Sequence, residues 1–356
     1  MRMKEGRQRE VNNKQPPPTS CCCFTASSST SCPPRLYFSP PPLLCVTVIY
    51  IPLMLFGLLG NILTILVVWL RPHMRSSTYL YLSSMAVSDM LILLLMPLDL
   101  YKLWRPRPWT LGDLFCKLTM FLSECCTFCT ILHITFLSLE RYLAVCWPIT
   151  AKTVVTRRRT RAVIGCLWLG AAVSAAPVLI MVGVEDVCRC THHAVASGLL
   201  STMMILSNLY FLVPLCIMGL VYSLIGRTLW LRPKSSRRDQ SHRNTVKMLG
   251  MIILAFIVCW LPFHVGRTIF SLSMDTGIDT RSHNLDLGIE TRENDSYFNL
   301  VSSVLFYLSA AVNPLLYNLM SARYRHAVHS LIHTHSHTQA HHLRSTLTAR
   351  HSTTTM

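Results

Sequence analysis

The chain has 356 residues, of which 51% are hydrophobic and only 14% are charged, whereas about a quarter of the residues in ordinary soluble domains are charged. A net charge of +17 in a soluble protein would favour nucleic-acid binding, but the long apolar runs here leave no basic face for it. Among the 15 cysteines no Cys-x-x-Cys pair meets a second pair, which argues against a zinc framework. We therefore assign the positive charge to the cytoplasmic loops of a membrane protein.

The first part of the chain, residues 1–42, is rich in Pro, Ser, Thr and Cys. It contains no apolar run of the kind found in a cleaved signal peptide. A segment of this composition cannot bury enough apolar surface to fold alone. We predict a disordered extracellular tail.

Seven apolar stretches follow, each long enough to cross a bilayer, which takes about 20 helical residues. They cover residues 43–70, 77–104, 113–146, 161–183, 197–231, 245–272 and 297–320. Only helices and closed barrels satisfy their backbone groups in lipid, and these runs lack the alternation of barrel strands. The sequence therefore predicts an all-α integral membrane protein with a seven-transmembrane helix bundle over residues 43–320.

The connectors between these stretches differ in charge. Those after the first, third and fifth stretches are basic, and the one after the sixth is acidic. The basic connectors hold Arg71, Arg75, Lys152, Arg157, Arg158, Arg159, Arg161, Arg232, Lys234, Arg237, Arg238 and Arg243. The acidic connector holds Asp275, Asp279, Asp286, Glu290, Glu293 and Asp295. Because basic loops stay in the cytoplasm, we expect a multi-pass plasma-membrane protein with an extracellular N-terminus, and Asn294 in its sequon becomes a candidate glycosylation site.

The segment after the seventh stretch, residues 321–333, places Tyr324, Val328, Leu331 and Ile332 at helical spacing with basic residues between them. This pattern is typical of an amphipathic helix that lies on the inner leaflet, and we predict a short eighth helix. Residues 334–356 are rich in His, Ser and Thr and are predicted to form a disordered cytoplasmic tail. Its hydroxyl groups are candidate targets of receptor kinases, and hence of arrestin.

Ionisable groups inside apolar spans are costly, which makes them the first functional candidates. Asp89 lies in the middle of the second stretch, and a buried carboxylate needs a proton, a cation or hydrogen-bond donors. The side chains of Thr130, Ser309 and Asn313 are suited to complete a cage around a sodium ion with it. The alternative is a protonated Asp89 in a purely structural hydrogen-bond network.

Two further motifs lie toward the cytoplasm. Glu140, Arg141 and Tyr142 end the third stretch, where the acid and base can pair and Arg141, once released, can enter a partner's surface. The alternative is an ion pair whose long side chains simply reach the water at the membrane surface and have no role in signalling. Asn313 and Tyr317 lie one turn apart on either side of Pro314, which favours a second local break in a helix.

The sixth stretch contains a predicted hinge. Pro262 removes a backbone hydrogen bond and kinks the helix just after Trp260. Phe263, His264 and Arg267 follow Trp260 by three, four and seven residues, so they share its face. They are candidate residues of a ligand pocket above the hinge.

The outer end of the bundle holds the other pocket candidates. Cys116 opens the third stretch and can pair with Cys188 or with its rival Cys190. Glu124 lies eight residues after Cys116, which in a helix is about 12 Å deeper. This depth is sufficient to place Glu124 inside a cavity that opens to the outside. Asp99, on the second stretch, lies at a similar depth.

These motifs occur together and in order, and as a set they resemble the rhodopsin-like (class A) G-protein-coupled receptors over residues 43–332. The set comprises Asn61, Asp89, Cys116, Glu140, Arg141, Tyr142, Trp168, Pro214, Tyr222, Trp260, Pro262, Asn313, Pro314 and Tyr317. Longer strings, such as CWLPFHVGR at 259–267, look like the ghrelin and motilin receptor subfamily, and ERYLAVC at 140–146 looks closer to its motilin branch.

The resemblance implies a receptor for a peptide hormone that is motilin-like, with a ghrelin-like receptor as the alternative. It implies coupling to a heterotrimeric G protein of the Gq class, phospholipase C and calcium. Glu124 would meet the cationic N-terminus of the peptide, Arg267 would pair with Glu124 or the ligand, and Asp99 would line the same pocket. The disulfide would join Cys116 to Cys188. Phe256 and Tyr222 would belong to the activation switch, and no cofactor is expected beyond an allosteric sodium ion.

Other classes of membrane protein fit the sequence less well. An opsin needs a lysine in the seventh stretch, and residues 297–320 contain none. A seven-helix transporter or channel, the remote alternative, would show repeat symmetry and half-helices. The histidines of the C-terminal tail lack carboxylate partners, so we do not expect an enzyme.

Overall fold

The protein is an elongated bundle of long helices, seen in a computed structural model that describes residues 40–105, 108–184, 188–231, 237–275, 285–321 and 324–331. For residues 266–275 and 285–297, as for some others, the structure describes the backbone and not the side chains. Seven long helices make up the bundle: α1 (Pro40–Leu70), α2 (Ser77–Trp104), α3 (Asp113–Cys146), α5 (Arg157–Ala175), α8 (Leu199–Leu231), α9 (Arg237–Asp275) and α10 (Leu285–Met320).

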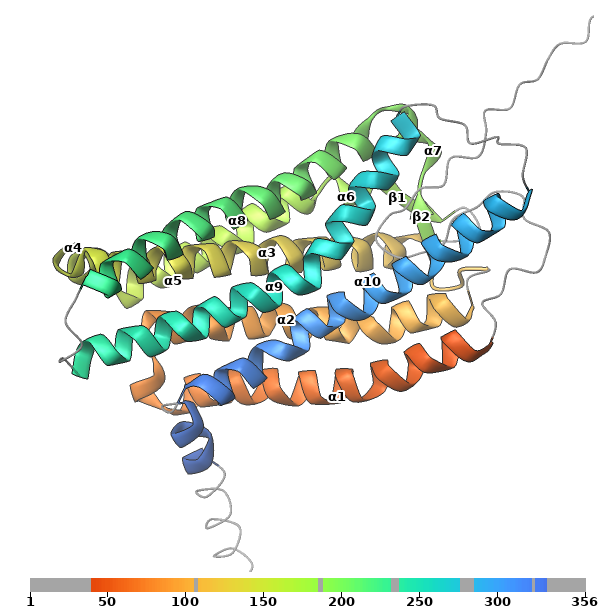
Figure 1. Ribbon diagram of the computed structural model, residues 1–356. Coiled ribbons are helices and arrows are strands. Elements are labelled where there is room, and N and C mark those ends of the chain that lie inside the picture. Colours follow the sequence, from red (N-terminus) through yellow and green to blue (C-terminus); the bar gives the residue numbers. More distant parts are fainter. Residues whose placement is uncertain are drawn as a thin grey trace, which may run out of the picture.

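Short elements connect these helices (Figure 1). At one end lie η1 (Pro72–Met74) and α4 (Pro148–Val154), and at the other lie α6 (Val178–Met181), the strands β1 (Val182–Val184) and β2 (Cys188–Cys190), and α7 (His192–Ala196). The two strands pair antiparallel as a small hairpin. A further helix over 324–331 follows α10, within the segment 321–333 predicted to be an amphipathic helix, whereas Ser321 itself is not helical.

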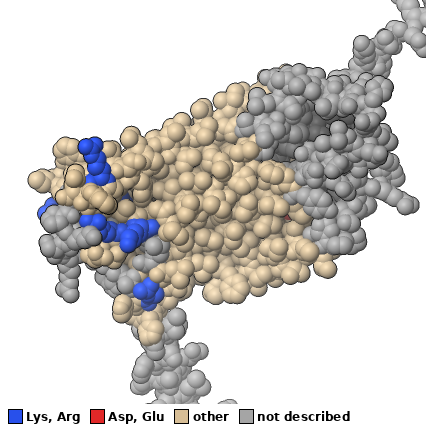
Figure 2. Space-filling model, viewed as in Figure 1, with Lys and Arg blue, Asp and Glu red and all other residues tan. Residues whose placement is uncertain are grey.

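Six of the long helices are long and apolar enough to span a bilayer, and α9 contributes a shorter apolar segment, Leu249–Val265, within the described residues. Large apolar side chains lie exposed along the bundle, for example Phe56 (73% exposed) and Leu59 (65% exposed) on α1. In Figure 2 the Lys and Arg side chains gather at the end that carries α4, and the broad middle of this face is uncharged. This distribution matches a lipid belt next to a basic end and confirms the predicted helical membrane bundle.

Helix bounds differ from the predicted stretches where local chemistry or polarity intervenes. The fourth stretch does not stay helical to residue 183, because the chain breaks at Ala176 and Pro177, whose ring cannot continue the hydrogen-bond ladder, and β1 then begins at Val182. α9 and α10 begin before their apolar runs, so part of the predicted acidic connector belongs to the first turns of α10. Hydropathy detects only the length of a helix that lies within the lipid, whereas the hydrogen bonds of the helix backbone continue into water. The bundle also starts at Pro40, three residues into the predicted tail.

Polar side chains cross-link the bundle inside the apolar region. α3 lies in the middle and contacts α2, α5 and α8. The Asn61 amide on α1 donates to the backbone oxygen of Ala310 on α10 at 3.0 Å. The Trp168 indole N–H on α5 donates to the Ser84 hydroxyl on α2 at 2.9 Å. Each such bond fixes the rotation of one helix against its neighbour, because a polar atom in this region has few other partners.

Gly60 lets α1 approach α10 closely. A Cβ atom at this position would lie 2.8 Å from the Cβ atom of Pro314, a rigid group that cannot move aside without moving α10. We expect Gly60→Ala to destabilise the receptor by about 1–3 kcal/mol, the usual cost of overpacking. The thermal unfolding temperature of the purified receptor measures this.

Gly219 on α8 provides the matched control, because a Cβ there would meet no atom within 4 Å and the residue is exposed. Gly219→Ala should leave the unfolding temperature unchanged or raise it slightly. Equal effects of the two substitutions would show that α1 and α10 are not in close contact.

Candidate functional site

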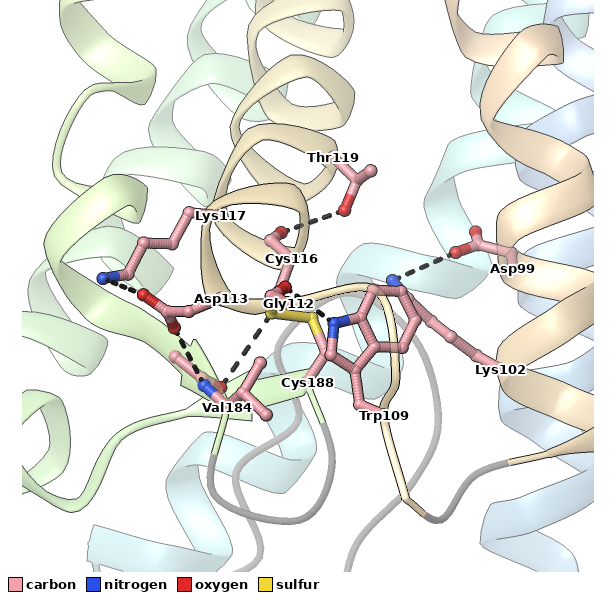
Figure 3. Close-up of a disulfide and its surroundings, with 11 residues drawn as sticks. Asp99, Lys102, Trp109, Gly112, Asp113, Cys116, Lys117, Thr119, Val184 and Cys188 are labelled. Atoms are coloured by element: carbon pink, nitrogen blue, oxygen red, sulfur yellow. Dashed lines mark hydrogen bonds and ion pairs between the residues drawn. A yellow bond between two sulfur atoms is a disulfide. The ribbon is translucent and has the colours of Figure 1, made fainter.

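A disulfide ties the outer hairpin to the bundle. Cys116 in the first turn of α3 is bonded to Cys188 on β2, with their Cα atoms 5.7 Å apart (Figure 3). This confirms the pairing that the resemblance implied, and the rival Cys190 is not the partner of Cys116. The bond holds the hairpin across the outer end of α3.

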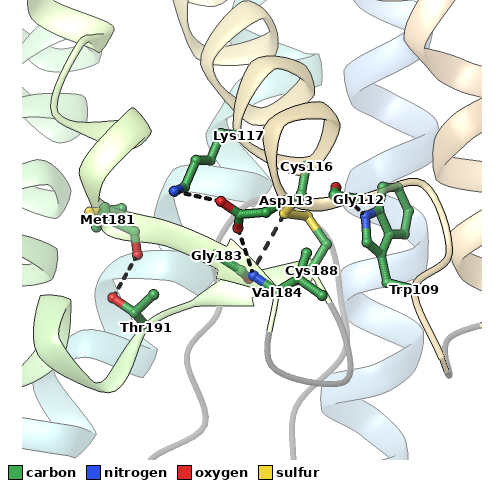
Figure 4. A network of polar contacts seen from close by, with 10 residues as sticks. All are labelled: Trp109, Gly112, Asp113, Cys116, Lys117, Met181, Gly183, Val184, Cys188 and Thr191. Atoms are coloured by element: carbon green, nitrogen blue, oxygen red, sulfur yellow. Dashed lines mark hydrogen bonds and ion pairs between the residues drawn. A yellow bond between two sulfur atoms is a disulfide. The ribbon is translucent and has the colours of Figure 1, made fainter.

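A second, polar contact fixes the same hairpin (Figure 4). The backbone N–H of Val184 on β1 donates to the Asp113 carboxylate at 3.1 Å, and Lys117 forms an ion pair with that carboxylate at 2.7 Å. Gly112 precedes Asp113 with φ = +85°, a conformation that favours glycine. Sequence reasoning missed Asp113, although an acidic residue in the first turn of a helix, three residues before the candidate disulfide cysteine, was a usable signal.

Asp99 lies at the centre of a polar group near this end (Figure 3). Its carboxylate accepts a hydrogen bond from the Tyr307 hydroxyl on α10 and lies 3.4 Å from the Lys102 ammonium group. Lys102 also lies over the Trp109 ring, 5.5 Å from its centre. Asp99 therefore joins α2, α10 and the first outer connector. Lys102 and Trp109 were not predicted, although Asp99 and Lys102 have the i, i+3 spacing of a helical ion pair.

Glu124 is fully buried on α3, at 0% exposure. The side chain of Arg267, its predicted partner, lies outside the described side chains, so that pairing stays a prediction. On the neighbouring helices the imidazole of His264 lies 3.1 Å from the amide oxygen of Asn208 on α8 and stacks on Phe211 at 4.4 Å. A buried carboxylate in so apolar a bundle needs a compensating positive charge or donors.

The predicted hinge residues form an aromatic group below this region. The Trp260 ring contacts Phe306 on α10 edge to face, with ring centres 5.1 Å apart, and contacts Phe263 at 5.9 Å and Phe256 at 6.0 Å. Pro262 lies inside α9, which changes direction in its outer half (Figure 1). A shift of α9 at this point would therefore move the Trp260 ring against α10.

Two of the residues predicted to hold sodium are in contact with each other. The Asn313 amide donates to the Asp89 carboxylate at 2.9 Å, and Asp89 is buried. The hydroxyl of Thr130 lies 2.8 Å from that of Ser88, and the hydroxyl of Ser309 donates to the backbone oxygen of Phe306. The structure thus joins Asp89 to Asn313, while the two hydroxyl groups have other hydrogen-bond partners. Ser88 was not among the predicted members.

At the end of α3 that adjoins α4, the Arg141 guanidinium group forms an ion pair with Glu140 at 2.8 Å. Tyr142 and Tyr222 are half-buried there, and Tyr317 is buried at the end of α10. The adjacent acid and base pair with each other, as the sequence allowed. Arg141 is therefore engaged within its own helix in this arrangement.

Comparison with known proteins places these motifs in context. Residues 60–317 match the family model "7 transmembrane receptor (rhodopsin family)". The chain is 50% identical over 303 residues to growth hormone secretagogue receptor type 1 of Sus scrofa, covering 81% of this chain and 80% of the relative. It is 40% identical over 343 residues to the motilin receptor of Homo sapiens, with the same coverage. It is 32% identical over 319 residues to neurotensin receptor type 1 of Homo sapiens, covering 79% of this chain and 74% of the relative.

Proposed function

The chain belongs to the rhodopsin family of seven-transmembrane receptors, and from this premise we propose that it carries the signal of a motilin- or ghrelin-type peptide to a G protein of the Gq class. That it is a G-protein-coupled receptor of the peptide-hormone type, and not an enzyme, follows from its relatives. The finer proposal depends on one observation. Two carboxylates, Asp99 and the fully buried Glu124, lie on adjacent helices near the outer end, beneath a disulfide-bonded hairpin.

The identity of the peptide is open between two related classes. Short strings of the sequence favour the motilin branch, whereas overall identity is higher to growth hormone secretagogue receptors, at 50% against 40%. Both peptides therefore belong in the test. We would express the receptor and measure intracellular calcium against motilin, ghrelin and related peptides. A calcium response to one of them is expected, and no response to any of them would refute the ligand class.

The proposed mechanism is a two-state equilibrium of the bundle. The cationic end of the peptide enters near Glu124, with Asp99, Phe263, His264 and Arg267 lining the same pocket. Its contacts differ between the two states and shift Trp260 with the kink at Pro262. Because coupling between sites is reciprocal, a bound G protein should also tighten agonist binding.

The cytoplasmic half of the mechanism rests on Arg141. The ion pair to Glu140 supports a closed state in which Arg141 is held within α3. Release of Arg141, together with movement of Tyr222, Asn313, Pro314 and Tyr317, opens a site for the G protein. Tyr142 completes this coupling motif. Receptor kinases and arrestin would act on the C-terminal tail, which lies outside the described residues.

We also propose that the protein lies in the plasma membrane with its N-terminus outside, because basic connectors stay in the cytoplasm. The basic end at α4 then faces the cytoplasm, and the hairpin faces the ligand. The side chain of Asn294 lies outside the described side chains, and its glycosylation remains a prediction.

We further propose a sodium ion beside Asp89. The oxygen ligands fit a hard cation, because they are carboxylate, hydroxyl and amide oxygens, and a hydroxyl that donates its proton keeps lone pairs for a cation. Asp89, Thr130, Ser309 and Asn313 would hold it. Bound sodium would supply positive charge that stabilises the buried carboxylate.

Sodium binding predicts a measurable stabilisation. Thermal unfolding of the receptor should occur at a higher temperature in sodium chloride than in choline chloride of equal ionic strength. The free energy of unfolding should rise by about 1.4 kcal/mol when sodium is at ten times its Kd. Asp89→Asn should abolish this difference, whereas Asp113→Asn, at the outer surface, should preserve it. If the unfolding temperature of the wild type is the same in both salts, Asp89 has no sodium ion and belongs to a structural network.

A further inference from the structure

The helix over 324–331 is held on the bundle by hydroxyl groups. Ser321, between α10 and this helix, accepts a hydrogen bond from the backbone N–H of Tyr324 at 3.2 Å, as an N-cap residue does. The same hydroxyl lies 3.1 Å from the hydroxyl of Tyr79 in the first turn of α2. Ser321 therefore starts the helix and joins it to α2.

Tyr324 forms the second attachment. It is 2% exposed, and its hydroxyl lies 2.9 Å from the hydroxyl of Thr64 on α1. The Thr64 hydroxyl already donates its one proton to the backbone oxygen of Gly60 at 2.9 Å. Tyr324 must therefore be the donor and Thr64 the acceptor. Burial raises the pKa of Tyr324, so the donating proton is retained at physiological pH.

The Tyr324 ring also reaches the predicted activation switch. It contacts the ring of Tyr317 edge to face, with ring centres 6.3 Å apart. Ala327 is buried in the same cluster, and Val328 and Leu331 pack against it. The contact surface of Tyr317 therefore depends on where Tyr324 is held.

We propose that Thr64, Tyr79, Ser321 and Tyr324 form a hydroxyl clasp that positions the helix over 324–331 and, through the Tyr324 ring, favours the closed state of the receptor. The clasp is present in the structure together with the Glu140–Arg141 ion pair. Its preference for the closed state requires that these hydroxyl bonds weaken when Arg141 is released, because only a difference in contacts between the two states shifts their equilibrium. Tyr324 and Thr64 act as positioning residues that need not touch ligand or G protein. The effect on signalling rests on the proposed G-protein coupling, whereas the attachment of the helix does not.

The test uses substitutions that remove only the hydroxyl groups. In Tyr324→Phe and Thr64→Val the ring and the branched side chain remain, and Thr64→Ser retains the hydroxyl as a rescue. Thr202→Val is the matched control, because Thr202 makes the same local bond to the backbone oxygen four residues earlier but is exposed on α8. All variants are made in the full-length receptor in nanodiscs.

Two measurements separate the attachment of the helix from its effect on signalling. Hydrogen exchange of residues 324–331 should become roughly 2- to 10-fold faster in Tyr324→Phe and in Thr64→Val, the range expected for one lost hydrogen bond. Ligand-independent nucleotide exchange on a purified G protein should rise over a similar range. The double variant should match either single one in both measurements, and Thr64→Ser and Thr202→Val should match the wild type.

Unchanged hydrogen exchange in both single variants, or additive effects in the double variant, would overturn the clasp. Faster hydrogen exchange with unchanged or lower basal nucleotide exchange would overturn its preference for the closed state. If the wild type with agonist activates no G protein, the proposed function fails, and hydrogen exchange alone still decides whether the clasp holds the helix.

Discussion

Replacing Cys188 with serine is expected to lower agonist potency by at least about 10-fold and to lower the free energy of unfolding. The bond to Cys116 closes a loop with a sequence separation of 72. Loop-closure entropy for this length corresponds to about 4 kcal/mol in the chain-entropy account. Potency falls in addition, because the hairpin then loses its covalent bond to α3 near the proposed pocket. Agonist dose–response curves and thermal unfolding of the purified receptor measure the two effects.

Controls for this prediction come from the other cysteines. Cys45 on α1 is exposed and free, and Cys45→Ser should change neither quantity. Cys116→Ser and the double variant should match Cys188→Ser, since one bond is lost in each case. The polar contact between Asp113 and Val184 remains in all of them, so the hairpin keeps this attachment to α3. If potency stays at the wild-type level while stability falls, the hairpin has no part in shaping the ligand site.

The helices were predictable because lipid imposes a simple rule on sequence. A run of about 20 apolar residues must be helical to satisfy its backbone, so composition alone indicated each span. The stretches 77–104 and 113–146 coincide with α2 and α3. The rule says nothing about the parts of α9 and α10 outside lipid, or about the break near Pro177 followed by β1. There the outcome depends on local backbone chemistry and on pairing with β2.

The candidate site could be predicted from the sequence only where its residues belong to motifs with a recognisable spacing. Asp89 and Asn313 were grouped by their motifs, and they lie in contact. By contrast, the contact of Tyr324 with Thr64 joins residues 260 positions apart, and neither residue is unusual in its own segment. The contact of Asp113 with Val184 is another such case, because it depends on a hairpin that hydropathy cannot detect. Long-range polar contacts of this kind need the helix packing, which a single sequence does not specify.

Replacing Glu124 with glutamine is expected to reduce agonist potency by about 10- to 100-fold while leaving the receptor at the cell surface. The substitution keeps the shape of a side chain that is 0% exposed and removes its charge. An interaction of a cation with a buried carboxylate contributes about 1.5–3 kcal/mol, which corresponds to this range of potency. Calcium dose–response curves and antibody staining of intact cells measure potency and surface expression.

A modified peptide turns this prediction into a test of one contact. Acetylation of the agonist's N-terminus removes the cation that we expect Glu124 to bind. The acetylated peptide should be weak on the wild type and should lose little further potency on Glu124→Gln, because the same interaction is already absent. Equal losses for the free and the acetylated peptide would show that Glu124 does not meet the amine. Ser123→Ala, one residue earlier on α3, should change neither result.

Asp99 and Glu124 differ in the partners that they already have, so their substitutions should reduce agonist potency to different extents. The Asp99 carboxylate already accepts a hydrogen bond from Tyr307 and has the Lys102 ammonium group at 3.4 Å, which itself lies over Trp109. A ligand cation at Asp99 must compete with Lys102, so its net gain is smaller than the direct attraction. Asp99→Asn should therefore reduce potency less than Glu124→Gln does. Glu124, on the adjacent helix α3 and at 0% exposure, is therefore the carboxylate whose loss of charge should reduce agonist potency most.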